Sequence, residues 1–202
     1  GTLTLKGGTH TAKNVTVAEN ANVTFASGIY KGATINGTAT VKEGVTFTST
    51  VTVNGTLNAK GGTFNGSVKF NGSSIANISG GSFTSDRTHG GVEFDYNVTG
   101  TISGGTFVFA DFYTTKVKLS GGTFTTIITN GDRKLADLLA EGAAYYNGDS
   151  AVSDDNVSKL TNVTVKSHEH NGGADSKGIC SICGKQMAAS LTVGGKTSWY
   201  AA

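Results

Sequence analysis

The chain has 202 residues, of which 30 are glycine, none is proline and 15% are charged, with a formal net charge of +2. This weak charge, without a run of lysine or arginine, argues against a nucleic-acid partner. No apolar stretch approaches the roughly 20 residues that cross a bilayer as a helix, which argues against membrane insertion. Abundant Gly, Asn, Thr and Val alternate turn formers with strand formers, so an all-β domain is expected.

The first sixty residues alternate short strand patterns with turns. Residues 1–5 are already an alternating strand, so the chain starts within a pattern, as a segment of a longer protein would, and the lack of a signal peptide is uninformative. Further short strands are expected at residues 15–17, 23–25, 40–41, 45–47 and 51–53. The segments between them carry Asn-Gly, Glu-Gly and single-glycine turn signals.

A four-residue motif then recurs at spacings of 19, 24 and 17 residues. Its copies are Gly61-Gly62-Thr63-Phe64, Gly80-Gly81-Ser82-Phe83, Gly104-Gly105-Thr106-Phe107 and Gly121-Gly122-Thr123-Phe124. A period near 20 residues is typical of a solenoid, in which stacked coils align like residues into interior ladders. We therefore expect a right-handed parallel β-helix over residues 1–131, with the four phenylalanines in one ladder. Asn-Gly turns would also suit the hairpins of a β-sandwich, but the repeated Gly-Gly corner favours the solenoid.

The longest interval between repeats contains the densest polar insertion, residues 85–91. Tyrosine, phenylalanine and arginine dominate binding hot spots, and such residues lie in or near this insertion. The candidate partner-binding residues are Asp86, Arg87, His89, Tyr96, Phe112 and Tyr113. The alternative interpretation is that the rings belong to the interior and the loop is a solvated corner. We favour the interior for Phe107 and Phe109, which share one strand face.

No catalytic constellation is recognisable. Asp86, Glu93, Asp95 and Asp111 form the only local acidic group, and they are spread over several corners. Glycoside cleavage needs carboxylates a few ångströms apart on one face. We interpret these residues as solubilising charge and expect no enzymatic activity.

The pattern changes at Asn130-Gly131-Asp132. Leucines 135, 138 and 139 have helical spacing, Asp132 suits an N-cap and Gly142 suits the position after the last turn. A capping helix over residues 133–141 is expected, followed by strands at 143–149 and 159–165. These elements make up a closing segment, residues 132–166.

A metal-ligand pattern follows, over residues 167–187. His168 and His170 precede Cys180 and Cys183 by a glycine-rich segment with almost no apolar content. Two thiolates and two imidazoles satisfy the four-ligand preference of zinc, and a segment without a core needs a cross-link to hold it. We predict a structural Cys2His2 zinc knot. A Cys180–Cys183 disulfide and a redox Cys-x-x-Cys are the alternatives. Residues 188–202 then open a new apolar pattern, as the start of a following module.

The Ser-Gly-Gly-Thr-Phe corners, the segment at 134–142 and the His/Cys segment ending in Cys-x-x-Cys-Gly resemble repeat modules of large surface proteins from gut Firmicutes. The resemblance spans nearly the whole chain, although those modules often have cysteine at the position of His168. It implies a parallel β-helix in a wall-attached or secreted protein. Some similar commensal proteins bind immunoglobulin as B-cell superantigens, which implies an antibody variable domain as a partner.

Three functions are compared. We expect a non-enzymatic binding module, an adhesin-like part of an extracellular repeat protein that contacts a host protein, with immunoglobulin first among the candidates, or a glycan. The first alternative is a structural spacer that projects other domains from the cell. The second is a polysaccharide-cleaving β-helix enzyme.

Overall fold

The structure, a computed structural model, describes residues 1–152, 157–168, 180, 188–193 and 196–201. Short strands make up the N-terminal third: β1 (Thr2–Leu5), β2 (Thr9–His10), β3 (Val15–Val17), β4 (Asn22–Phe25), β5 (Gly28–Tyr30), β6 (Ala33–Ile35), β7 (Thr38–Val41), β8 (Val45–Phe47) and β9 (Val51–Val53). Longer strands and two short 3-10 helices follow: β10 (Thr56–Phe64), β11 (Val68–Phe70), β12 (Ile75–Phe83), η1 (Arg87–His89), β13 (Val92–Phe94), β14 (Thr99–Phe112), β15 (Val117–Thr129) and η2 (Leu135–Leu138). The last strands are β16 (Ala143–Asn147), β17 (Ser150–Ala151), β18 (Lys159–Ser167), β19 (Ala188–Val193) and β20 (Lys196–Ala201).

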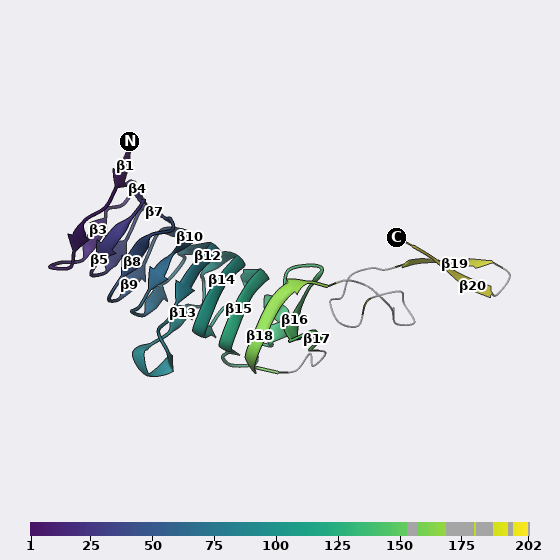
Figure 1. The fold of residues 1–202 in the computed structure, drawn as a ribbon. Coiled ribbons are helices and arrows are strands. Elements are labelled where there is room, and N and C mark those ends of the chain that lie inside the picture. The colour runs from purple at the N-terminus through teal and green to yellow at the C-terminus, as the bar shows by residue number, and fades with distance from the viewer. Residues whose placement is uncertain (153–156, 169–179, 181–187, 194–195, 202) are drawn as a thin grey trace.

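Strands β1 to β15 form a parallel β-solenoid of seven coils, each with three strand positions (Figure 1). The first face stacks β1, β4, β7 and the first halves of β10, β12, β14 and β15. The second face stacks β2, β5, β8 and the later parts of β10, β12, β14 and β15. The third face stacks β3, β6, β9, β11, β13 and the ends of β14 and β15. The expected parallel solenoid is thereby confirmed, and the β-sandwich is excluded.

The predicted phenylalanine ladder lies inside the second face. Phe83 stacks on Phe64 and on Phe107, with ring centroids 4.5 and 4.6 Å apart and planes within 7° of parallel. Phe124 continues the stack from Phe107 at 4.8 Å, and Phe47 continues it on the other side of Phe64. Like residues in register on successive coils bury each other, which is why the motif repeats.

A second aromatic ladder fills the third face and corrects one expectation. Phe94 stacks on Phe70 at 4.9 Å and on Phe112 at 4.3 Å, and all three rings are buried. Phe112 was a candidate partner-binding residue, yet it pairs in register with Phe94 and faces the core. A fully buried ring has no area to offer a partner, so Phe112 is removed from the candidate surface.

Glycine pairs turn the last four coils between the first and second faces. At Gly121 a Cβ would lie 2.2 Å from the Ser103 carbonyl oxygen of the preceding coil, so only glycine allows the two backbones to stack there. Gly122 takes a φ of +108°, which side chains rarely adopt. In the motif, the first glycine therefore allows close backbone stacking and the second takes a positive φ. The Thr-Phe pair that follows continues into the second face.

The end of the solenoid is closed differently from the prediction. The expected helix over residues 133–141 is only a single 3-10 turn, η2. Its N-cap is Lys134, and the prediction of Asp132 as the N-cap is wrong. Leu135 and Leu138 are buried in the core, while Leu139 bridges in parallel to Leu119 of the last coil. Pairing with that coil requires an extended backbone after residue 138, which ends the helix.

Strands β16 and β18, both expected from the sequence, form an antiparallel ribbon. Strand β18 pairs with β15 from Gly122 to Ile128, along the second face and most of the third, and places Val163 opposite Phe124. Val163, Val165, Ala143 and Tyr145 join the core of the solenoid. The segment therefore covers the edge that the last coil would otherwise expose.

The C-terminal strands β19 and β20 form an antiparallel hairpin within the segment that was expected to open a following module. Within the residues that the structure describes, no helix is long and apolar enough to cross a membrane.

Candidate binding surface

The polar insertion at residues 85–91 forms an ordered loop between β12 and β13, which protrudes from the solenoid beside β13 (Figure 1). Asp86 caps η1: its Oδ1 accepts the backbone N–H of His89 at 3.0 Å and the Thr88 hydroxyl at 2.7 Å. Its carboxylate also lies 2.7 Å from Nδ1 of His89. These donors, first Thr88 and then His89, lower the pKa of Asp86 to about 2. The loop is therefore fixed by its own side chains while Asp86, Arg87 and His89 stay exposed.

Phe109 lies beneath this loop and anchors it. Its ring is 7% exposed but is not part of the core cluster inside the solenoid. The Arg87 guanidinium carbon lies 6.0 Å from the ring centroid, and Gly91 packs so closely that a Cβ there would lie 2.5 Å from the ring. The expected interior position is therefore correct for Phe107 and wrong for Phe109, which is buried beneath the insertion instead of inside the solenoid.

A tyrosine and arginine cluster lies at the corner after the third face. Tyr96 is 57% exposed, and its ring centroid lies 5.5 Å from that of half-buried Tyr113. The guanidinium carbon of Arg133 lies 5.3 Å from the Tyr96 ring centroid. Two rings and one guanidinium thus form a contiguous surface, which we call the aromatic corner.

Charged side chains occupy the outer column of the third face. Register places Lys69, Glu93 and Asp111 side by side on successive coils, and Lys69 Nζ lies 3.4 Å from Glu93 Oε2. Asp111 is mostly buried and accepts a hydrogen bond from the Asn130 side chain. Desolvation raises the pKa of Asp111, with Glu93 adding to the effect, and the Asp111 charge in turn raises the pKa of Tyr113.

A small hollow of about 240 Å³ lies between the charged column and the aromatic corner. Its lining consists of Lys69, Phe70, Asn71, Glu93, Asp95 and Tyr113. Asp95 accepts the backbone N–H groups of Gly72 and Tyr96 at 3.3 and 2.7 Å, so it fixes the corner. Arg87 lies over Phe109, two residues before Asp111 on β14, so the loop adjoins the charged column beside the hollow. We call the loop, the aromatic corner and this hollow together the loop surface.

Five of the six predicted partner-binding residues lie on the loop surface: Asp86, Arg87, His89, Tyr96 and Tyr113. Sequence reasoning missed Arg133, Lys69 and Asn130, which lie many residues away in the chain. Coil register places Lys69 beside Glu93, while the segment after β15 brings Asn130 to Asp111 and Arg133 to Tyr96. Lys69 with Glu93 could have been found by aligning the residues between the buried positions of adjacent coils.

The predicted zinc ligands are only partly within the described residues. His168 is half-buried with Nδ1 2.7 Å from the Tyr146 hydroxyl oxygen, and Cys180 is buried. His170 and Cys183 lie outside the described residues. Among the residues that the structure does describe, no group of three metal-ligating side chains is found. An orienting hydrogen bond on one ring nitrogen is typical of metal-bound histidine, so His168 is compatible with the predicted role.

No family model, no curated protein and no solved structure matches the chain.

Proposed function

We propose that the chain is a non-enzymatic binding module of an extracellular bacterial repeat protein, attached to the cell surface or secreted. The loop surface contacts a host protein, and an immunoglobulin variable domain is the first candidate. The observation that carries this proposal is the exposed aromatic corner beside a protruding, internally capped loop. Tyrosine and arginine supply most hot-spot energy at protein interfaces.

The rigidity of the loop supports the same proposal. Binding through a flexible loop loses affinity because its side chains and backbone must be ordered. Here Asp86 already holds the backbone of His89, and Ser85 Oγ donates to the His89 carbonyl at 3.1 Å. The exposed Arg87 is held over Phe109. Little ordering therefore remains to be done when a partner binds.

The carboxylates of the loop surface support a non-enzymatic role. Glu93 pairs with Lys69, Asp95 caps the corner, and Asp86 caps the loop. Each carboxylate thus has a structural partner, and polysaccharide cleavage by this group is the less favoured function. Cleavage of an acidic polysaccharide that is lost in Glu93→Gln would reverse this preference.

Binding to immobilised antibody fragments tests the proposal. The module should bind Fab but not Fc fragments, because only Fab contains variable domains, and Arg87→Ala with Tyr96→Ala should weaken binding about thirtyfold or more. Ile29→Ala with Lys60→Ala is the matched control, since both residues are exposed on other parts of the solenoid. Equal binding by both double variants, binding to Fc alone, or no binding would contradict the proposal.

A spacer is the second candidate function. The continuous ladders of one rigid parallel stack favour it, because such a stack projects whatever follows it in the chain. Failure to capture any protein from serum or mucosal secretions would favour the spacer over the binding module.

We propose in addition that His168, His170, Cys180 and Cys183 hold one structural zinc ion. The composition of the segment supports this, since metal binding would supply the folding free energy that a core does not. Protein purified without chelator should contain zinc in a 1:1 ratio, and Cys183→Ala should lose it. Absence of zinc, with a Cys180–Cys183 disulfide found by mass spectrometry, would overturn this proposal.

A further inference from the structure

A second hollow lies nearer the N-terminal end of the solenoid, at the corner where the third face meets the first face in coils two to four. It encloses about 410 Å³ and is lined by Asn20, Ala21, Asn22, Asn36, Gly37, Thr38, Gly55 and Thr56. We call it the asparagine-threonine groove. None of its residues belongs to the loop surface, so nothing in this inference depends on the proposed function.

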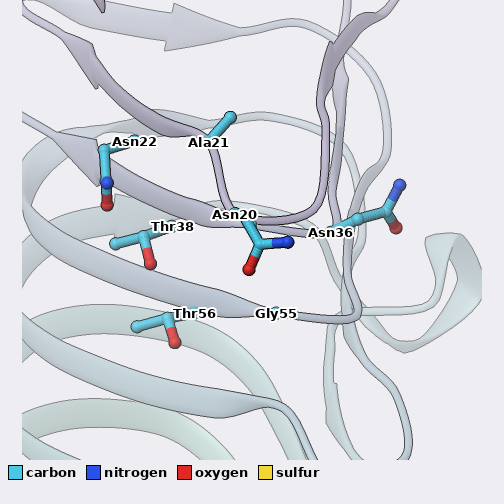
Figure 2. A pocket seen from close by; sticks show the side chains of 8 residues that line it. Asn20, Ala21, Asn22, Asn36, Thr38, Gly55 and Thr56 are labelled. Carbon is cyan, nitrogen blue, oxygen red and sulfur yellow. The ribbon is translucent and has the colours of Figure 1, made fainter. Parts of the chain in front are cut away.

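The groove has polar side chains that are available to a ligand. Asn36 accepts a hydrogen bond from Asn54 Nδ2 at 2.8 Å. The side chains of Asn20, Asn22, Thr38 and Thr56 make no hydrogen bond to any other residue in the described part of the chain. Figure 2 shows Asn22, Thr38 and Thr56 in one column, with the Asn20 amide beside them. Two amides and two hydroxyls therefore present both donors and acceptors at one site.

The composition of the lining excludes most ligand classes. A phosphate or an acidic ligand needs cationic partners, and a metal cation needs carboxylates, but no lining residue is charged. An apolar ligand needs an apolar lining, and the only hydrophobic side chain here is Ala21. An extended peptide needs pockets for alternate side chains, which a Thr and Asn wall lacks. A neutral ligand rich in hydroxyl groups remains.

The coil register adds a repeat to this chemistry. Asn22, Thr38 and Thr56 pair directly on adjacent strands, so their side chains recur at the strand spacing of about 4.8 Å. A chain of linked sugars carries hydroxyl groups on every unit, so successive units can meet successive coils. In the next coil the residue in register with Thr56 is Ile75, an exposed hydrophobic side chain, so the polar column ends after coil four.

We infer that the asparagine-threonine groove binds a neutral oligosaccharide, laid across coils two to four with its hydroxyl groups on Asn20, Asn22, Thr38 and Thr56. No aromatic ring lines the groove, so hydrogen bonds alone supply the affinity. Each of these hydrogen bonds replaces one to water and contributes little net free energy, which places the dissociation constant of one module at about 1 mM.

Backbone amide chemical shifts of the whole chain test the inference. Three tetrasaccharides serve as probes: one of β-linked N-acetylglucosamine, one of β-linked glucose and one of galacturonic acid. We expect saturable shifts at residues 20–22, 36–38 and 55–56 with at least one neutral probe, and none there with the acidic probe. Thr38→Val with Thr56→Val should abolish them, because valine keeps the strand-forming shape and removes the hydroxyl.

The control is Thr46→Val with Thr63→Val, an identical chemical change at a paired column of the second face. It should leave the titration unchanged. Asn20→Gly gives a second readout, because glycine keeps the positive φ of 60° at this position while the amide is lost, and the affinity should fall. Absence of groove shifts with both neutral probes, shifts with the acidic probe alone, or equal titration of the Thr38 and Thr46 double variants would overturn the inference.

Discussion

At the scale of single residues, the ladder rings carry the largest share of packing. Phe83 is 1% exposed and lies between two like rings, so a truncation leaves a cavity that the stacked coils above and below cannot fill. Phe83→Ala should lower the free energy of unfolding by about 3–5 kcal/mol. Urea unfolding followed by far-UV circular dichroism measures the change.

Tyr96→Ala is the matched control, since it removes an aromatic ring that is mostly exposed. We expect a change within about 0.5 kcal/mol. A similar loss in the two variants would mean that the ladder does not hold the solenoid together.

Asp111 gives a pH dependence whose sign follows from its burial. In the folded protein the pKa of Asp111 is raised above the ordinary value of 3.8, so the folded state binds the Asp111 proton more tightly than the unfolded state does. Its ionisation therefore removes stability as the pH rises from about 3.8 through the raised pKa, and the loss is complete above it. Asp111→Asn should be more stable than the wild type at pH 7. Denaturation between pH 3 and pH 8 should show this advantage shrinking toward low pH, and an advantage that is constant with pH would refute the prediction.

Asp86 gives a pH dependence of stability with the opposite sign. Its pKa is lowered to about 2 by the hydrogen bonds that cap η1, so its contribution is present above the unfolded value of 3.8 and is lost as the pH falls toward 2. In Asp86→Asn the loop should open more often at pH 7, which hydrogen exchange of the His89 amide measures. Below about pH 2 the exchange rates of variant and wild type should coincide, whereas a difference that persists there would count against the charged cap.

The sequence predicted the residues of one ladder but not the other. Phe64, Phe83, Phe107 and Phe124 each follow a glycine pair, so their equivalence is visible in the motif. Phe70, Phe94 and Phe112 share no such marker, and coil lengths that range from 16 to 24 residues hide their register. For that reason Phe112 looked like a candidate surface residue until the strand pairing placed it.

Among the elements, β18 protects the end of the stack. Coils two to six have a neighbouring coil on both sides, but β15 has an open edge unless β18 pairs with it. Val163 is 1% exposed opposite Phe124, so a carboxylate there would be buried without a partner. Val163→Asp should cost about 3 kcal/mol or more and detach β18. The freed edge of β15 should then promote self-association, which light scattering after gel filtration detects.

Thr161→Asp is the control that separates the effect of burying a charge from the effect of adding a charge anywhere on β18. Thr161 lies on the same strand, exposed and opposite Thr126. A charge there stays in water, so the variant should remain monomeric and nearly as stable as the wild type. Association of both variants to the same degree would point to strand charge rather than to the opened edge.

The closing element also shows where local patterns fail. Leucines at 135, 138 and 139 have helical spacing, and an isolated peptide would be judged a helix from them. In the solenoid, the carbonyl oxygen of Leu119 accepts the Ala140 N–H at 2.8 Å, and this pairing requires an extended chain. The burial of the leucines could be predicted from their spacing. The extended backbone of this segment could not, because it depends on pairing with the neighbouring coil.

At the scale of the whole molecule, the stack is one-dimensional, because each coil contacts mainly the coils before and after it. The extra residues of the longest coil leave the solenoid as the loop at 85–91 without shifting the ladders. Coil length at the corners is therefore free, while register on the faces is fixed. This is why a loop can be inserted at a corner without changing the fold.

A coil deletion tests this directly. Asn36-Gly37-Thr38 and Asn54-Gly55-Thr56 are equivalent corners, since Thr38 pairs with Thr56. Removal of residues 38–55 joins Gly37 to Thr56, places the second-face strand of coil two beside β10 and preserves the corner sequence. We expect a folded protein with one coil fewer, a lower free energy of unfolding and a smaller denaturant dependence, because less surface is buried. Removal of residues 38–47 is the control, since it joins a first-face corner to the turn after a second-face strand. That variant should not fold cooperatively in urea. If both deletions fold equally well, or neither folds, the coil is not the unit from which this molecule is built.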